Sequence, residues 1–164
     1  MTLDTRPLAR RLAIIDPTTD PRWEAFVQGR PDSDVFHTAA WASVLMETYG
    51  YEPRYHVVEN SAGQIEAGWP CMLVASPLTG KRLVSLPFAD HCPPLVDTRM
   101  DAEALLDALI ADQGQTGAKT LEVRGWPRYG PPLPERLNQV QYYRLYATEL
   151  DPDPALFWKR ISKD

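Results

Sequence analysis

The chain has 164 residues, of which 44% are hydrophobic and 24% charged, and its formal net charge is −5. This length suits one domain with its own core, and the composition is too apolar for a disordered chain. The acidic balance argues against sequence-independent binding of nucleic acid, which needs a concentrated basic face. No integral membrane segment of about 20 apolar residues is present, and residues 1–11 lack the apolar core of a signal peptide, so we expect a cytoplasmic protein.

The cysteines and histidines do not have the spacing of a metal site. Cys71 and Cys92 lack the paired spacing of a zinc ribbon or a disulfide framework. His37, His56 and His91 include no i, i+4 pair that would place two ligands on one helical face. The sequence therefore predicts reduced thiols and no metal.

The first elements are a short strand and two helices. Residues 12–15 are apolar and end at an Asp-Pro turn, which predicts a strand. Asp20 and Pro21 are typical of a helix start, and Gly29 is expected to end that helix. A second helix is predicted over residues 38–49, with Gly50 as its left-handed cap.

A three-stranded meander is predicted next. Strands over residues 54–59 and 64–74 flank a polar turn, and residues 81–86 add a third strand after a Pro-Leu-Thr-Gly turn. Pro70 lies inside the second strand and removes one hydrogen-bond donor. We therefore expect a bulge or an unpaired backbone position there.

The remaining pattern predicts helix, strand, strand and helix. Asp101 is expected to cap a helix that ends at Gly114 and Gly117 and has one apolar stripe, formed by Ala102, Leu105, Leu106, Leu109 and Ile110. Strands are predicted over residues 120–124 and 141–150, on either side of a Pro-rich loop. A last helix starts at Asp153 and Pro154 and carries the apolar residues Leu156, Phe157 and Ile161.

This order of elements resembles the GNAT acyltransferase fold, and four segments are similar to parts of the FemAB-type ligases. Residues 36–41 read Phe-His-Thr-Ala-Ala-Trp, followed at 50–53 by Gly-Tyr-Glu-Pro, which resembles the opening of that family. The loop 85–95 after the third meander strand, and the segments 121–124 and 153–160, also look like their counterparts.

The resemblance implies an α/β (α+β) fold, in which a mixed, largely antiparallel sheet is flanked by helices. It implies a disordered stretch over residues 1–11 and a GNAT-like domain over 12–150. Residues 151–164 would begin a helix that leads to a missing second half, because FemAB-type enzymes have two GNAT-like halves. The chain is thus expected to be the N-terminal, acceptor-side half.

GNAT domains that bind acyl-CoA normally have a glycine-rich cradle, (Gln/Arg)-x-x-Gly-x-(Gly/Ala), whose backbone N–H groups hold the pyrophosphate. The matching residues 88–94 contain no glycine and have two prolines, which cannot donate. An aspartate there would also repel phosphate. We expect no cofactor in this half.

Asp90 and His91 are candidate substrate-binding residues in that loop. His91 can donate or accept near neutral pH, and Asp90 could orient it. A structural turn in which Asp90 satisfies backbone N–H groups is the other interpretation. A Cys92–His91 nucleophilic pair is disfavoured, because adjacent residues in an extended loop point in different directions.

Arg124 and Trp41 complete the predicted substrate-binding set. Arg124 ends a strand and could clamp a carboxylate or phosphate, or form a salt bridge with Glu122 or Asp90. Trp41, with Trp69 and Tyr49, could line a groove for sugar or peptide, or belong to the core. Basic charge for a nucleotide-linked precursor is scarce nearby, and Lys81 or Arg82 could supply it. No catalytic residue is predicted.

The implied reaction is attack of an amine on an activated acyl group. The acceptor would be a cell-wall precursor, another small molecule or a related glycopeptide, and the donor an aminoacyl-tRNA or acyl-CoA bound through the second half. A non-catalytic GNAT-like binding module and a stand-alone N-acetyltransferase are the alternatives. A homodimer through the C-terminal helix is also open.

Overall fold

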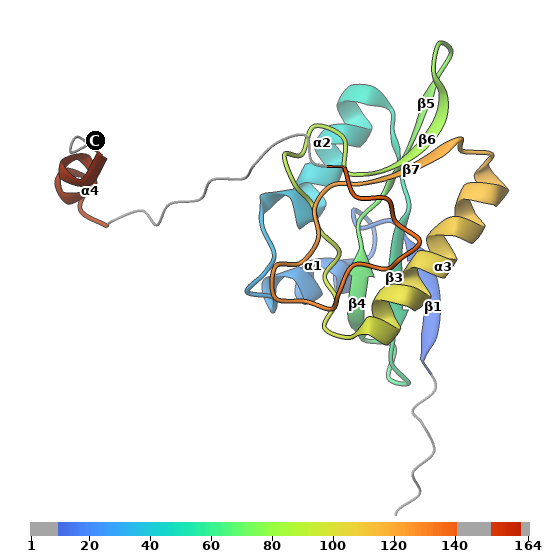
Figure 1. The fold of residues 1–164 in the computed structure, drawn as a ribbon, viewed down its shortest axis with the longest axis horizontal. Coiled ribbons are helices and arrows are strands. Elements are labelled where there is room, and N and C mark those ends of the chain that lie inside the picture. The colour runs from blue at the N-terminus through green and yellow to red at the C-terminus, as the bar shows by residue number, and fades with distance from the viewer. Residues whose placement is uncertain (1–9, 141–151, 162–164) are drawn as a thin grey trace, which may run out of the picture. The chain divides into compact units, whose positions relative to one another are not determined.

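The computed structural model describes residues 10–140 and 152–161, which belong to two compact units, residues 1–134 and 135–164. The first unit contains seven strands in two sheets together with the helices α1, α2 and α3, and the second contains α4 (Figure 1). The expected α/β class is confirmed. The predicted strand over residues 141–150 lies outside the described residues, so this strand and the domain boundary at 150 stay predictions.

The first sheet is antiparallel, with the order β1–β3–β4. Its strands are β1 (Arg11–Ile15), β3 (Tyr55–Glu59) and β4 (Ile65–Trp69). The register pairs Ala13 with Val57, and Val57 with Gly68. A bulge between Val58 and Glu59 shifts the pairing close to the polar turn of the hairpin.

The second sheet is mixed, with the order β2–β5–β6–β7. It consists of β2 (Glu52–Pro53), β5 (Met72–Ser76), β6 (Gly80–Ser85) and β7 (Thr120–Val123). β6 and β7 are parallel, since the helix α3 (Arg99–Thr116) connects them, and every other pair is antiparallel. The mixed, largely antiparallel arrangement is thus confirmed.

The two sheets meet at Pro70, where the predicted single strand over 64–74 is in fact two strands. Pro70 cannot donate to a ladder, and the chain passes from β4 in the first sheet to β5 in the second across Pro70 and Cys71. The segment paired with it changes sheets in the same way at Arg54, which lies between β2 of the second sheet and β3 of the first. The N–H of Arg54 donates to the carbonyl of Cys71 at 2.8 Å. The expected break at Pro70 is confirmed, and the continuous strand was wrong.

Alternate residues of β3 contact helices on opposite faces of the first sheet. Tyr55 packs edge-on against Trp23 of α1 (Pro21–Gln28), with ring centroids 5.0 Å apart. His56 points the other way, and its Nε2 lies 3.4 Å from a carboxylate oxygen of Asp112 on α3. The period of two in a strand therefore places α1 and α3 on the two sides of this sheet.

The short helices before the hairpin begin at polar caps, of which Asp20 was predicted. Asp20 accepts from the N–H of Arg22 at the start of α1. Thr38 caps α2 (Ala39–Tyr49), and Gly50 ends it with φ 67°, a left-handed conformation that suits glycine. Between them a short 3₁₀ helix, η1 (Val35–His37), is capped by Asp34.

Two predicted details of α3 were wrong. The cap is Thr98, because its backbone is extended and its hydroxyl accepts from the N–H of Asp101, which lies in the first turn. The buried residues of α3 extend to Asp112, and the helix continues past Gly114. It ends at Gly117, which has φ 69°. The stripe itself is confirmed for four of its residues, the fully buried Ala102, Leu105, Leu106 and Leu109; Ile110 is 42% exposed.

The second unit contains α4 (Pro154–Ile161), whose start is as expected. Asp153 accepts from the N–H of Ala155 at 2.9 Å and so caps the first turn. Leu156 and Trp158 are exposed. Within the part of the chain that the structure describes, no helix is both long and apolar enough to cross a lipid bilayer.

Candidate functional site

The candidate site is built on the loop between β6 and α3, residues 86–98. Ser85 Oγ donates to the carbonyl of Cys92 at 2.7 Å, and the N–H of Cys92 donates to the carbonyl of Arg124 at 2.5 Å. Farther along, Leu95 and Gly68 exchange two backbone hydrogen bonds. The loop is thus fastened to the ends of β6 and β7 and to β4.

These bonds use much of the loop's donor capacity. The N–H groups of Ala89, Cys92 and Leu95 donate to carbonyls of the chain, and Pro93 and Pro94 have no N–H. A pyrophosphate needs several neighbouring backbone donors. Five of the seven positions 89–95 therefore have no N–H left for a ligand, and the absence of a phosphate cradle in this loop stays a prediction.

His91 faces a carboxylate, and that carboxylate is Asp34. His91 Nε2 lies 3.4 Å from Asp34 Oδ2, and the imidazole side chain is 37% exposed. Its ring stands edge-on to Phe36, with centroids 6.5 Å apart. Gly125 backs the ring with φ 92°, and a Cβ on it would lie 3.4 Å from the Cβ of His91. The expectation that Asp90 orients His91 was therefore wrong.

The carboxylate of Asp34 has two contacts besides the one with His91. Its Oδ1 accepts from the N–H of Phe36 at 2.9 Å and lies 2.9 Å from His37 Nδ1. His37 is fully buried, and its Nε2 donates to the carbonyl of Pro93 at 2.9 Å. Burial opposes ionisation of Asp34, but the contacts with His37, Phe36 and His91 outweigh it and lower the pKa of this carboxyl.

Asp90 is exposed, and within the described residues its carboxylate has no hydrogen bond or ion pair. It therefore does not satisfy backbone N–H groups of the turn. A free carboxylate beside His91 is available to a ligand.

Arg124 links the loop to β7. Its Nε donates to Glu122 at 2.8 Å, which confirms the salt bridge that was one of its two interpretations. Its Nη1 donates to the carbonyl of Ala89 at 3.0 Å. The side chain is 26% exposed, so it braces the loop and still reaches solvent.

Trp41 joins the site through Phe36. The rings of Phe36 and Trp41 stand edge-on, with centroids 5.2 Å apart, so Phe36 connects Trp41 to His91. Trp41 is half-buried, and its Nε1 is buried without a partner among the described residues. Trp69, by contrast, is fully buried, as the core interpretation predicted for it.

Tyr49 belongs to an exposed aromatic stack that the sequence did not reveal. It lies 4.7 Å from Phe88 and 5.4 Å from Tyr51 between ring centroids. Phe88 has φ 60°, which is uncommon for a residue with a side chain, and is 57% exposed. The stack borders the same loop, two positions before Asp90.

Cys92 is fully buried, and burial raises the pKa of its thiol well above the ordinary value. A thiol nucleophile needs thiolate character and access. The structure therefore rules out Cys92 as the nucleophile, as expected.

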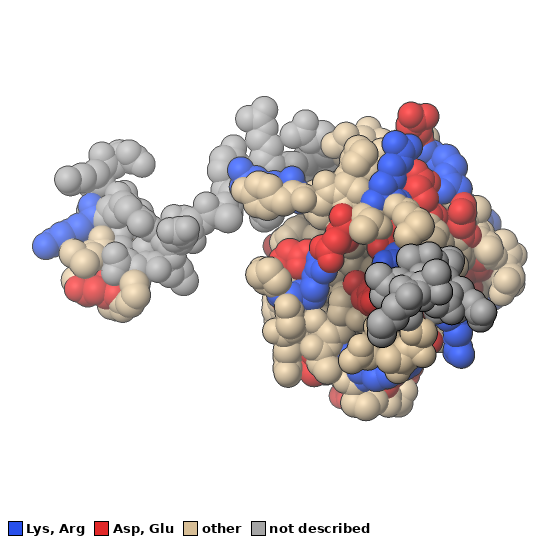
Figure 2. All heavy atoms as spheres, turned by 90° about the horizontal axis from the view of Figure 1, so that it is seen from below, with Lys and Arg blue, Asp and Glu red and all other residues tan. Residues whose placement is uncertain are grey.

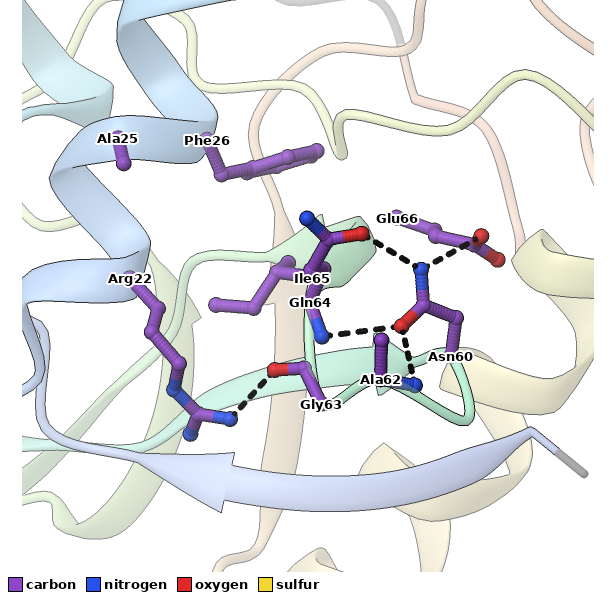
Figure 3. A pocket seen from close by; sticks show the side chains of 9 residues that line it. All are labelled: Arg22, Ala25, Phe26, Asn60, Ala62, Gly63, Gln64, Ile65 and Glu66. Carbon is purple, nitrogen blue, oxygen red and sulfur yellow. Dashed lines mark hydrogen bonds between the residues drawn. The ribbon is translucent and has the colours of Figure 1, made fainter.

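An open cavity lies away from this loop. It has a volume of about 540 Å³ and is formed by α1 and the β3–β4 turn, with Arg22, Phe26, Asn60 and Gln64 among its lining residues (Figure 3). The side-chain amide of Asn60 forms hydrogen bonds within its own turn and with the side chains of Gln64 and Glu66. None of the four predicted site residues lines this cavity.

Charged side chains of both signs are mixed on the face that Figure 2 shows, and no candidate metal cluster occurs among the described residues. On the face in Figure 2, Lys and Arg side chains lie among Asp and Glu side chains. Within the described residues, no group of three or more His, Cys, Asp or Glu side chains could hold a metal ion.

The fold and this loop define an α/β protein with a parallel β6–α3–β7 unit. No family model and no curated protein matches the chain. Among solved structures, a ribosomal-protein-alanine N-acetyltransferase from Brucella melitensis is similar, with 15% identity and a TM-score of 0.48, over 87% of this chain and 100% of that one. A Trypanosoma brucei acetyltransferase is similar at 17% identity and a TM-score of 0.47, with the same coverage. Neither similarity carries information on substrate or mechanism.

Proposed function

We propose that the chain is the N-terminal, acceptor-side half of a FemAB-like acyl or aminoacyl transferase, acting on an amine of a cell-wall precursor or related glycoconjugate. One observation carries this proposal. The two segments with the clearest resemblance, residues 36–41 and 85–95, are distant in sequence but contact each other. His37 bonds to the carbonyl of Pro93, and Phe36 packs against His91.

We place the acceptor beside this contact. His91 packs there against Phe36, which also contacts Trp41, and Arg124 donates to the carbonyl of Ala89 in the same loop. The exposed side chains of Phe88 and Asp90 belong to this loop as well. Aromatic faces stack on sugar rings, while the charged groups could bind an ammonium and a carboxylate. In this reaction the acyl group arrives activated, so the protein mainly aligns two partners and manages a proton.

Calorimetry with acetyl-CoA separates this proposal from a stand-alone N-acetyltransferase. Pro93 and Pro94 cannot donate, and the N–H groups of Ala89, Cys92 and Leu95 already donate within the chain, so we expect no saturable binding at micromolar concentrations. Saturable binding would contradict the acceptor-side assignment and favour the stand-alone enzyme.

Titration with a soluble muramyl peptide that has a free amine tests the acceptor side. We expect His91→Ala to weaken binding while the Tm stays close to that of the wild type, because the imidazole is partly exposed. Leu78→Ala, on the β5–β6 turn, is the control and should bind as the wild type does. A lower Tm with unchanged affinity in His91→Ala would point to a structural role. Binding without any transfer by the enzyme that contains this half would favour the non-catalytic module.

A further inference from the structure

His91 differs from the other two histidines in its access to solvent. His37 is fully buried, and both of its ring nitrogens have partners within the chain. His56 is 1% exposed. The His91 side chain is 37% exposed, and within the described residues its Nδ1 has no hydrogen-bond partner. Only this imidazole can exchange a proton directly with a bound molecule.

The carboxylate that faces His91 is well fixed. Asp34 caps η1 through Oδ1, which also contacts His37, and this leaves Oδ2 for His91. An ionised carboxylate can only accept, so a neutral His91 must direct an Nε2–H toward it. The lone pair of the ring then lies on Nδ1, the nitrogen without a partner.

Packing keeps the ring in this orientation. Phe36 stands edge-on to His91, and the backbone of Gly125 lies against the His91 side chain. An imidazole with one nitrogen facing a fixed, partly buried carboxylate and the other nitrogen free is the arrangement of a general base. The 3.4 Å separation is longer than a hydrogen bond, as is common for catalytic pairs in the absence of substrate.

We propose that His91 accepts the proton of the attacking amine and that Asp34 is the positioning residue that orients it. This inference rests on the proposed function. The ammonium of the acceptor gives one proton to His91 Nδ1. The free amine then forms the N–C bond to the acyl carbon while the C–O bond of the donor ester breaks. The second proton shed by nitrogen neutralises the departing alkoxide, and the third stays on the amide.

The first experiment determines the tautomer of His91 in the full chain at pH 8 from the ¹⁵N shifts of its ring nitrogens. The wild type should show a protonated Nε2 and a bare Nδ1. Asp34→Ser keeps a good cap for η1 but removes the carboxylate, so the two shifts should move toward each other. The matched control, Asp90→Ser, should leave them unchanged. Unchanged shifts in Asp34→Ser, or an effect of Asp90→Ser alone, would overturn the role of Asp34.

The second experiment uses p-nitrophenyl acetate as an ester probe that needs no natural substrate. An accessible lone pair on His91 should make the wild type release p-nitrophenol about threefold faster than His91→Ala, with Asp34→Ser in between. Leu78→Ala, at an exposed position on the β5–β6 turn, should react like the wild type. Equal rates for the wild type and His91→Ala would overturn the proposal. Failure of the proposed function would appear differently, as acetyl-CoA binding or as absence of muramyl-peptide binding by the wild type.

Discussion

The imidazole of His56 lies in the interior between β3 and α3, next to the ion pair of Arg54 and Asp112. Arg54 reaches both carboxylate oxygens of Asp112, at 2.7 and 2.5 Å. His56 Nδ1 lies 2.9 Å from the carbonyl of Arg54. Burial lowers the pKa of His56 to about 4, and the nearby Asp112 offsets only part of that effect because Arg54 already pairs its charge.

Protonation of His56 should make stability depend on pH. The unfolded chain takes up a proton at the ordinary value of 6.5, whereas the folded chain does so only near 4. Stability should therefore fall as the pH decreases from about 7 to 4, by on the order of 2 kcal/mol. Urea unfolding of the wild type and His56→Gln across this range measures the effect, and the slope should be smaller in the variant. His91→Gln is the exposed control; equal slopes in all three proteins would contradict the prediction.

The Arg54–Asp112 pair gives a second prediction at the residue scale. Asp112 is buried, so Arg54→Met would leave an uncompensated charge inside and should cost about 3 kcal/mol or more in unfolding free energy. Arg54 also pairs with Glu52, whose side chain is 57% exposed. Glu52→Gln is therefore the matched control and should cost less than about 1 kcal/mol. Similar losses in the two variants would show that the buried pair is not the dominant interaction.

At the scale of elements, replacing glycine with alanine should have opposite effects on stability at two positions. A Cβ on Gly68 of β4 would approach Trp23 Cη2 to 2.8 Å. The Trp23 ring cannot retreat easily, because it is fully buried and its Nε1 donates to the carbonyl of His37 at 2.7 Å. Gly68→Ala should therefore destabilise the protein by about 2 to 3 kcal/mol.

Gly114 is the matched position, since it lies inside α3 and a Cβ there meets nothing within 4 Å. Gly114→Ala should stabilise the protein by about 0.5 to 1 kcal/mol, because alanine is the better helix former. Thermal and urea unfolding of both variants would measure the difference. A loss in Gly114→Ala would mean that the interior of α3 is less regular than the structure indicates.

At the scale of the whole molecule, α4 belongs to a different compact unit from the sheets. A helix of eight residues is marginal in water unless one face is covered, and Leu156 and Trp158 are exposed. Amides of residues 154–161 should therefore exchange rapidly in a monomer, or become protected with rising concentration if two copies pair. Strong protection that does not depend on concentration would contradict the expected missing second half. Leu109 in α3 is the internal reference for slow exchange.

How much could be predicted from sequence depends on the range of the interactions concerned. Asp20, Gly50 and Gly117 were recognised because a cap or a left-handed turn is decided within a few residues. The sequence analysis predicted Asp101 as the cap of α3, whereas the cap is Thr98. Both side chains can accept from nearby N–H groups, and the cap is the residue whose backbone is extended. Pro70 was recognised as an interruption, but not as the passage between two sheets.

The sequence by itself determined the local elements, their order and the absence of a glycine-rich phosphate cradle, because these follow from nearby residue types and hydrophobic period. Only the tertiary structure decided which carboxylate serves His91. Asp90 is its neighbour in sequence, yet successive side chains in an extended loop diverge, and the fold brings Asp34 to the ring instead. The nearby hydrogen bond between His37 and Pro93 joins residues 56 positions apart and has the same physical origin. Contacts between distant residues are decided by the packing of whole elements.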